Sequence, residues 1–175
     1  MPRSRTIRVT AALSAVLIVV IAWYLGSPLF VRTTVNEPAP TLALASVTLD
    51  PRVTPLAVIS AEALTSVLAR GELQYVDALH NGKGPVRLMR VGVQRFMRFE
   101  NVMITNAPDV HVYLSRESGG KWTEGTSLYL GPLKATSGSF NYEIAGGTDL
   151  APYRSVVVWC RAFSVLVTWA DLDRV

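Results

Sequence analysis

The sequence predicts an all-β protein: an antiparallel β-sandwich or flattened barrel of about eight strands, preceded by one transmembrane helix, a tether and a short helix. Residues 9–31 contain no charged residue, and a stretch of this length can cross a bilayer. From Gly71 onward, short segments alternate polar and apolar residues, as half-buried strands do. Gly, Pro, Asn and Asp residues separate these segments and predict turns.

Residues 1–31 predict a single-pass membrane anchor. Trp23 and Tyr24 lie near the far end of the apolar stretch, where aromatic rings favour the membrane interface. The basic residues before the stretch are Arg3, Arg5 and Arg8. They orient the N-terminus inside, so the rest of the chain is expected on the extracytoplasmic side of the cell membrane. A cleaved signal peptide is the alternative, but the apolar stretch exceeds the roughly 7–15 residues of a signal-peptide core, and no Ala-x-Ala site follows it.

Two segments connect the anchor to the β domain. Residues 32–59 are rich in Pro, Thr and Ala and predict an extended tether. Residues 60–70 predict a short helix, with Ser60 as its N-cap and Gly71 beyond its end. The apolar stripe of this helix is Leu64, Val67 and Leu68. We expect the helix to cover the open end of the domain; the alternative is a helix that docks on a partner.

Residues 71–175 form the predicted β domain. Strand-like segments lie at 86–92, 94–99, 101–105, 110–115, 140–144, 156–159 and 163–169. The last two are the richest in apolar residues and are expected at the centre of a sheet. Residues 1–60 account for +3 of the formal net charge of +4, and the domain contains no run of Lys and Arg. Nucleic-acid binding is therefore not expected.

Six segments of the domain follow one another in a recognisable order. They are His80-x-x-x-Gly84, Arg98-Phe-Glu-Asn101, Pro108-Asp-Val-His-Val-Tyr-Leu-Ser115, Gly138-Ser-Phe-Asn-Tyr142, Asp149-Leu-x-x-Tyr153 and Ser155-Val-Val-Val-Trp-Cys-Arg-Ala-Phe-Ser-Val165. Over about residues 71–173 the chain resembles the DM-thirteen domain family, which is labelled an electron-transfer domain. That family occurs beside DOMON domains in Skeletor-type extracellular proteins, and many bacterial members have an N-terminal membrane segment. Departures are small: Val102 replaces a frequent aromatic residue, and Ala107 replaces a frequent Gly.

The resemblance implies a β-sandwich whose hallmark cysteine, here Cys160, acts in redox chemistry as a bare thiol or as a ligand to a group such as haem. Cys160 is the chain's single cysteine, so no internal disulfide is possible. A guanidinium such as that of Arg161 lowers the pKa of a nearby thiol, although strand neighbours point to opposite faces. The alternative is an inert cysteine in the core.

The identity of a cofactor stays open. Covalent c-type haem is excluded because the chain has no Cys-x-x-Cys-His. Non-covalent haem would take an axial ligand from Cys160, His80, His111 or a methionine. His80 is the candidate cofactor ligand, whereas His111 alternates with valines and is expected to face solvent. No His or Met follows Cys160, which disfavours copper, and structural zinc lacks ligands.

Two functional classes follow. The first is a membrane-tethered extracytoplasmic electron-transfer module centred on Cys160, with an unidentified redox partner. The second is a non-catalytic binding or adhesion sandwich, which would use a sheet face or a loop such as 115–126 and keep Cys160 as core. Either one is closer to a module than to a stand-alone enzyme.

Overall fold

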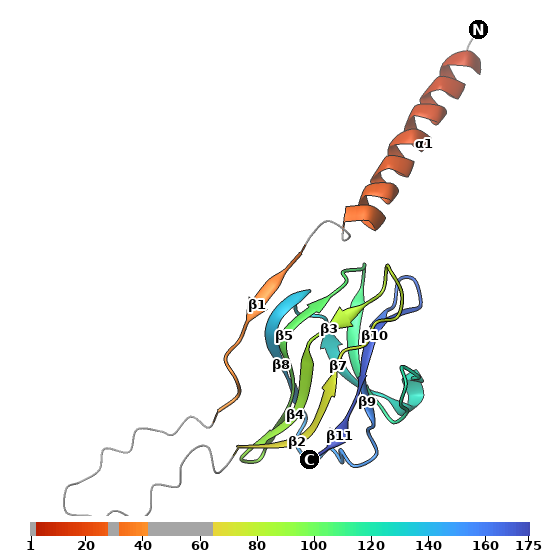
Figure 1. Ribbon diagram of the computed structural model, residues 1–175. Coiled ribbons are helices and arrows are strands. Elements are labelled where there is room, and N and C mark those ends of the chain that lie inside the picture. The colour runs from red at the N-terminus through yellow and green to blue at the C-terminus, as the bar shows by residue number, and fades with distance from the viewer. Residues whose placement is uncertain (1–2, 28–31, 42–64) are drawn as a thin grey trace, which may run out of the picture.

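The computed structural model describes residues 3–27, 32–41 and 65–175. Helix α1 (Arg3–Gly26) projects away from the β domain (Figure 1). Its window Ile7–Tyr24 has a mean hydropathy of 2.0 and is not buried by the rest of the chain. By length and composition this helix could cross a membrane, a property that N-terminal signal sequences share.

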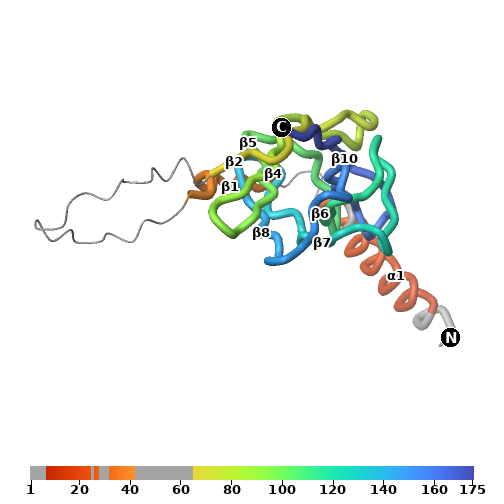
Figure 2. Tube along the Cα trace, turned by 90° about the horizontal axis from the view of Figure 1, so that it is seen from below, coloured from red at the N-terminus to blue at the C-terminus, as the bar shows by residue number. Residues whose placement is uncertain are grey.

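The described strands form two sheets and not a closed barrel, which confirms the predicted all-β sandwich. The seven-stranded sheet contains β1 (Thr34–Asn36), β2 (Thr65–Glu72), β3 (Gly82–Lys83), β4 (Pro85–Val91), β5 (Gln94–Ile104), β8 (Ser137–Ile144) and β11 (Asp173–Arg174). The four-stranded sheet contains β6 (Val110–Ser115), β7 (Leu128–Pro132), β9 (Ser155–Cys160) and β10 (Val165–Asp171), in the order β10-β9-β6-β7. A short 3-10 turn, η3 (Glu124–Thr126), lies between β6 and β7. Viewed from below, the two sheets form separate layers (Figure 2).

The core lies between these layers and follows from the two-residue period of the strands. Alternate residues of β9, Val156, Val158 and Cys160, are fully buried in it. From the larger sheet, Phe99 and Phe140 pack against each other with ring centroids 5.1 Å apart. Burial of each such side chain stabilises the fold by about 1.5–3 kcal/mol.

The prediction of a helix over residues 60–70 is wrong for its described part. Residues 65–70 belong to β2, which pairs with β4 on one side and β11 on the other. The register with β4 shifts between Val67 and Ala69, and Leu68 has no partner in it, so this bulge interrupts the strand alternation where two apolar residues, Val67 and Leu68, follow each other in the sequence. That pair imitates a helical stripe in the sequence. Residues 60–64, including Ser60 and Leu64, lie outside the described part of the chain.

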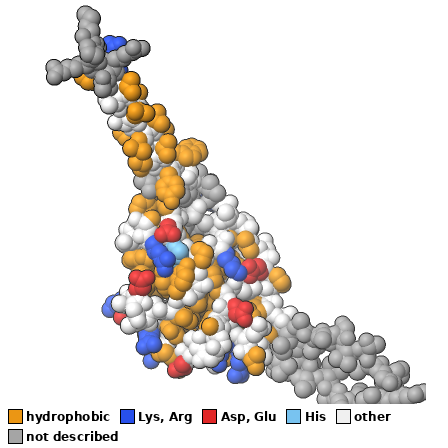
Figure 3. All heavy atoms as spheres, turned by 180° about the vertical axis from the view of Figure 1, so that it is seen from behind, with side chains coloured by type: hydrophobic (Ala, Val, Ile, Leu, Met, Phe, Trp, Pro, Cys, Tyr) orange, Lys and Arg blue, Asp and Glu red, His pale blue; other side chains and the backbone are white. Residues whose placement is uncertain are grey.

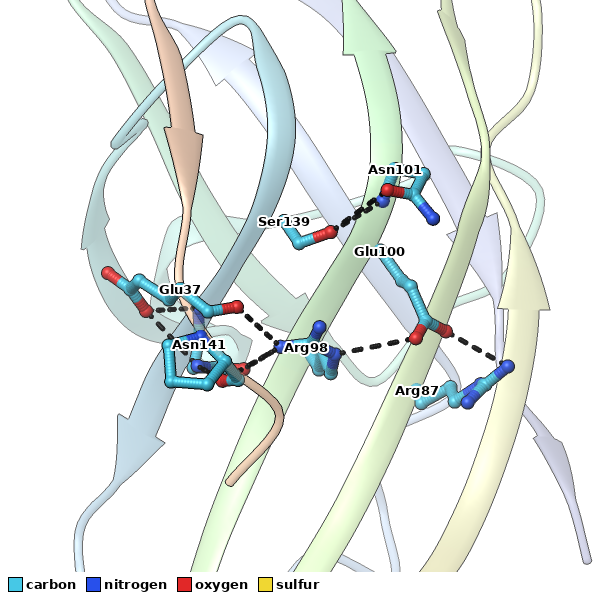
Figure 4. Close-up of polar contacts among 8 residues, drawn as sticks. Glu37, Arg87, Arg98, Glu100, Asn101, Ser139 and Asn141 are labelled. Atoms are coloured by element: carbon cyan, nitrogen blue, oxygen red, sulfur yellow. Dashed lines mark hydrogen bonds and ion pairs between the residues drawn. The ribbon is translucent and has the colours of Figure 1, made fainter. Parts of the chain in front are cut away.

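Residues 32–41 are extended, as expected of a tether, but they pack on the larger sheet. β1 pairs in parallel with β8, and we call residues 32–41 the strap. The Glu37 carboxylate accepts hydrogen bonds from the backbone N–H of Asn141 (2.8 Å) and from Nζ of Lys134 (2.8 Å). Arg98, which is 6% exposed, donates to the carbonyl of Pro38 and to Oδ1 of Asn141 (Figure 4). Tertiary contacts therefore dock the strap, and residues 42–59 lie outside the described part.

The pKa of the Glu37 carboxyl reflects its contacts in the docked strap. Burial acts to raise the pKa of its carboxyl, but the hydrogen bonds from Lys134 and Asn141 together hold that pKa below its ordinary value. The folded chain therefore favours the ionised form of Glu37. An Arg87–Glu100–Arg98 chain of ion pairs continues the polar surface across β4 and β5 (Figure 4).

Candidate functional site

Cys160 ends β9 with its side chain inside the sandwich core. Its backbone lies between Val110 of β6 and Val165 of β10, and no part of the residue is exposed. The thiol donates a hydrogen bond to the carbonyl oxygen of Pro108, with Sγ and O 2.8 Å apart. A sulfur in this position is shielded from direct attack on a partner's disulfide, because such exchange requires contact between two sulfurs.

Arg161 does not act on the thiol. Its guanidinium lies on the outer face of the four-stranded sheet, where Nε donates to the Tyr113 hydroxyl at 2.7 Å. The same group lies 4.8 Å from the ring centroid of Tyr129, within the range of a cation–π contact. Burial raises the pKa of Tyr113, and the hydrogen bond from Arg161 opposes that rise. The Arg161 guanidinium and the Cys160 thiol therefore lie on opposite sides of the four-stranded sheet, as strand neighbours do.

Aromatic side chains cover part of this outer face. Residues His111 and Tyr113 of β6 point outward because Val110 and Val112 point into the core. The connection between β6 and β7 folds back over the sheet, held where the Ser115 hydroxyl donates to the Lys121 carbonyl at 3.0 Å. We define the outer aromatic cluster as His111, Tyr113, Trp122, Tyr129 and Trp159.

The rings of the outer aromatic cluster form a connected series. Centroids are 4.9 Å apart for Trp159 and Trp122, 4.6 Å for Trp122 and Tyr113, and 5.3 Å for Tyr113 and Tyr129. His111 lies 5.6 Å from Tyr129. The series thus runs from the residue next to Cys160 to a tyrosine that is 45% exposed.

His111 is not solvent-facing, so that prediction is wrong. It does lie on the outer face of β6, but it is only 8% exposed. Its Nε2 lies 2.7 Å from Oδ1 of Asp109, and its Nδ1 lies 2.9 Å from the hydroxyl oxygen of Tyr129. Tyr129 comes from β7, the neighbouring strand, and contributes the contact that sequence alternation does not show.

The structure places His80 in the bend before β3. Nδ1 of His80 lies 2.8 Å from Oδ2 of Asp77, and the backbone N–H of His80 also donates to the Asp77 carboxylate. The His80 contact is the main reason why the pKa of Asp77 lies below its ordinary value. Among the described residues, no hydrogen bond links His80 to Cys160. His80 therefore has a local structural role, and the geometry does not join the two predicted site residues.

Haem ligation by Cys160 does not fit this arrangement. Cys160 belongs to the close-packed core, and its sulfur already contacts the Pro108 carbonyl. An axial ligand needs an open side facing the iron. Within the described residues, no group of three or more His, Cys, Asp or Glu side chains could hold a metal ion.

Two of the segments that carry the family resemblance meet at this site. The Cys160 thiol bonds to Pro108, and the backbone N–H of Arg161 donates to the Asp109 carbonyl at 3.0 Å. Sequence reasoning identified Cys160, but it missed Asp109, Tyr129 and the cluster. The outward alternation of His111 and Tyr113 was the one available signal for them.

Comparison with known families agrees with the resemblance. The family model described as "Electron transfer DM13" matches residues 74–172, which is more than half of the chain. This match contains all six of the segments quoted above. Neither the curated proteins nor the solved structures contain a significant match to the chain.

Proposed function

Because the chain belongs to the electron-transfer DM13 family, we propose that it is an electron-transfer module attached to the cell membrane by α1. The apolar window of α1 supports the attachment. The three arginines at the start of α1 support an orientation with the β domain on the extracytoplasmic side. The partner would be a redox protein that meets the exposed edge of the outer aromatic cluster.

The single observation that carries this proposal is the connected series of rings beside Cys160. Trp159 precedes the buried cysteine in β9, and its ring begins the series that reaches exposed Tyr129. Electron transfer, unlike disulfide exchange, does not require a partner to touch the thiol. Burial of Cys160 therefore argues against disulfide exchange with a partner and is compatible with electron transfer.

Cys160 stabilises the outer aromatic cluster from the core side of the four-stranded sheet. Its hydrogen bond to Pro108 and the neighbouring Arg161–Asp109 backbone bond hold the turn that carries the Asp109 carboxylate. Within this proposal, Cys160 is a positioning residue for the outer face. That Cys160 itself carries or ligates the electron carrier stays a prediction, and the experiment below tests it.

A second function has a specific observation in its favour. A non-catalytic binding or adhesion module requires an inert core cysteine, and Cys160 is fully buried. Tyr129 is 45% and Phe163 48% exposed, so aromatic contact area is available to a partner. Hydrophobic side chains are exposed over part of the β domain, with acidic and basic side chains around them (Figure 3).

One experiment separates these functions. The full chain is purified from the membranes of its own host, and its absorption spectrum is recorded during a mediated redox titration. An absorption band that vanishes in Cys160→Ala would show a cysteine-linked centre. A colourless protein that takes up and releases electrons reversibly would support transfer through side chains. A colourless protein that exchanges no electrons at any accessible potential would overturn the electron-transfer proposal in favour of the binding module.

A further inference from the structure

We propose that Tyr129, His111 and Asp109 form a relay for proton-coupled electron transfer, in which Tyr129 loses the electron and His111 receives the phenolic proton. This inference rests on the proposed electron-transfer function and names the side chain through which electrons enter or leave the domain.

The hydrogen bonds assign the proton positions in the relay. An ionised carboxylate only accepts hydrogen bonds, so Nε2 of His111, 2.7 Å from Asp109, carries a proton and donates it. In the neutral imidazole, Nδ1 then has a free lone pair. Nδ1 lies 2.9 Å from the Tyr129 hydroxyl oxygen, so the tyrosine donates and the imidazole accepts. A base is therefore already aligned with the phenolic proton.

This alignment defines a balanced step. A one-electron oxidant takes an electron from the Tyr129 ring, the Oη–H bond breaks, and the proton forms a new bond to Nδ1 of His111. The products are a neutral tyrosyl radical, an imidazolium and the reduced oxidant. The Asp109 carboxylate stabilises the imidazolium, as charge-assisted hydrogen bonds do. On re-reduction, an electron returns to the ring and the proton returns from Nδ1 to Oη.

Arg161 couples the electron to the proton. Its guanidinium lies 4.8 Å from the Tyr129 ring centroid. This positive charge disfavours a positive charge on the ring. A tyrosine radical cation is therefore opposed, whereas the neutral radical that remains after proton transfer is not. His111 is 8% exposed, so bulk water has little direct access to the transferred proton. Tyr129 is 45% exposed, which leaves its ring accessible to an oxidant.

Other tyrosines of the domain lack this arrangement. The Tyr113 hydroxyl accepts a hydrogen bond from the Arg161 guanidinium, which is not a base. The Tyr142 hydroxyl donates to the Pro132 carbonyl, and burial raises its pKa. Tyr75 is more exposed than Tyr129, at 65%, but the structure gives its hydroxyl no imidazole partner among the described residues. Exposure alone would make Tyr75 the preferred site of oxidation, whereas the relay selects Tyr129.

Flash oxidation tests this selection directly. The full chain in detergent micelles is oxidised by photogenerated ruthenium(III) tris-bipyridine, with persulfate as the sacrificial electron acceptor. The tyrosyl radical is followed by transient absorption and by electron paramagnetic resonance of frozen samples. We expect Tyr129→Phe to remove the fast radical signal and the matched control Tyr75→Phe to retain it.

Two further variants test the proton acceptor. Because positioned proton transfer contributes 10²–10⁴-fold in rate, we expect His111→Gln to slow the oxidation of Tyr129 by about 10²-fold and to abolish its solvent isotope effect. Asp109→Asn is a milder variant, since Asn tolerates the positive φ of 57° at this position. Its amide can donate to Nε2 and favour the tautomer with the proton on Nδ1, which leaves Tyr129 without an acceptor. Circular dichroism confirms that each variant is folded.

The outcomes separate the relay from the proposed function. Loss of the signal in Tyr75→Phe instead of Tyr129→Phe, or an unchanged rate in both folded His111 and Asp109 variants, would overturn the relay. The electron-transfer proposal would still stand if the chain from host membranes titrated reversibly. Conversely, a Tyr129 radical formed by the ruthenium oxidant in a chain that exchanges no electrons with mediators would reject the proposed function alone.

Discussion

The thiol of Cys160 donates a hydrogen bond to the carbonyl oxygen of Pro108, 52 residues earlier in the chain and 2.8 Å away. This bond joins the core-facing side of β9 to the turn that precedes β6. The next residue in that turn, Asp109, adopts a positive φ of 57° and directs its carboxylate to His111. One turn, Pro108 and Asp109, therefore contacts both the buried cysteine and the relay on the outer face.

We expect the Cys160 thiol to react with a disulfide reagent only when the folded chain opens. The residue has no exposed surface, so modification requires local or global unfolding. The measurement compares the rate of thiol modification in buffer and in guanidinium. Ser118→Cys, at an exposed loop position, is the control for a freely accessible thiol. A native Cys160 rate equal to that of the added cysteine would contradict the buried geometry.

We expect Gly138→Ala to detach the strap. Gly138 has a φ of +103°, and an added Cβ would collide with the carbonyl oxygen of Val35 in β1. The strained backbone alone costs about 1–3 kcal/mol. Hydrogen exchange of the β1 and β8 amides and chemical unfolding measure the effect. Gly146→Ala is the matched control, because a Cβ there meets no atom within 4 Å.

Acid should weaken the strap through Glu37. Its pKa is lower in the folded chain than the ordinary value of 4.5, so its contribution to stability is complete above that value. The contribution is lost as the pH falls through the folded-state pKa. Because the pair with Lys134 is partly exposed, we expect a loss of about 0.5–1 kcal/mol, reduced by salt.

Unfolding titrations across this acidic range test the Glu37 prediction. Glu37→Gln should flatten the pH dependence, whereas Glu117→Gln, at an exposed position on the connection between β6 and β7, should leave it unchanged. An identical pH profile in wild type and Glu37→Gln would show that the carboxylate does not stabilise the docked strap.

Leu17→Arg should release the chain from membranes. Leu17 lies within the apolar window of α1, and an arginine near the centre of a spanning helix opposes insertion by about 2.5–3.5 kcal/mol. Alkaline extraction of membranes, followed by immunoblotting, measures the retained fraction. Ile7→Arg, at the start of the window, is the control and should be retained. N-terminal sequencing of the mature chain detects cleavage, which would identify a signal peptide instead.

Several features of this protein could be predicted from neighbouring residues alone. The uncharged stretch predicted α1, and the two-residue alternation in 110–115 predicted a strand, which is β6. The failures have identifiable causes. The bulge in β2 lies where two apolar residues follow each other in the sequence, and this spacing is typical of a helix. Strand β1 is only three residues long, too short to show an alternation in the sequence.

The sandwich class, the apolar helix and the presence of a single cysteine follow from composition and from periods of two to four residues, which neighbouring residues already contain. The bond between Cys160 and Pro108 and the contact between Tyr129 and His111 arise only when distant segments pack against each other. The second contact depends on the pairing of β6 with β7, where the register shifts between Val112 and Tyr113. Such a shift arises from packing between distant segments, and no local pattern encodes it.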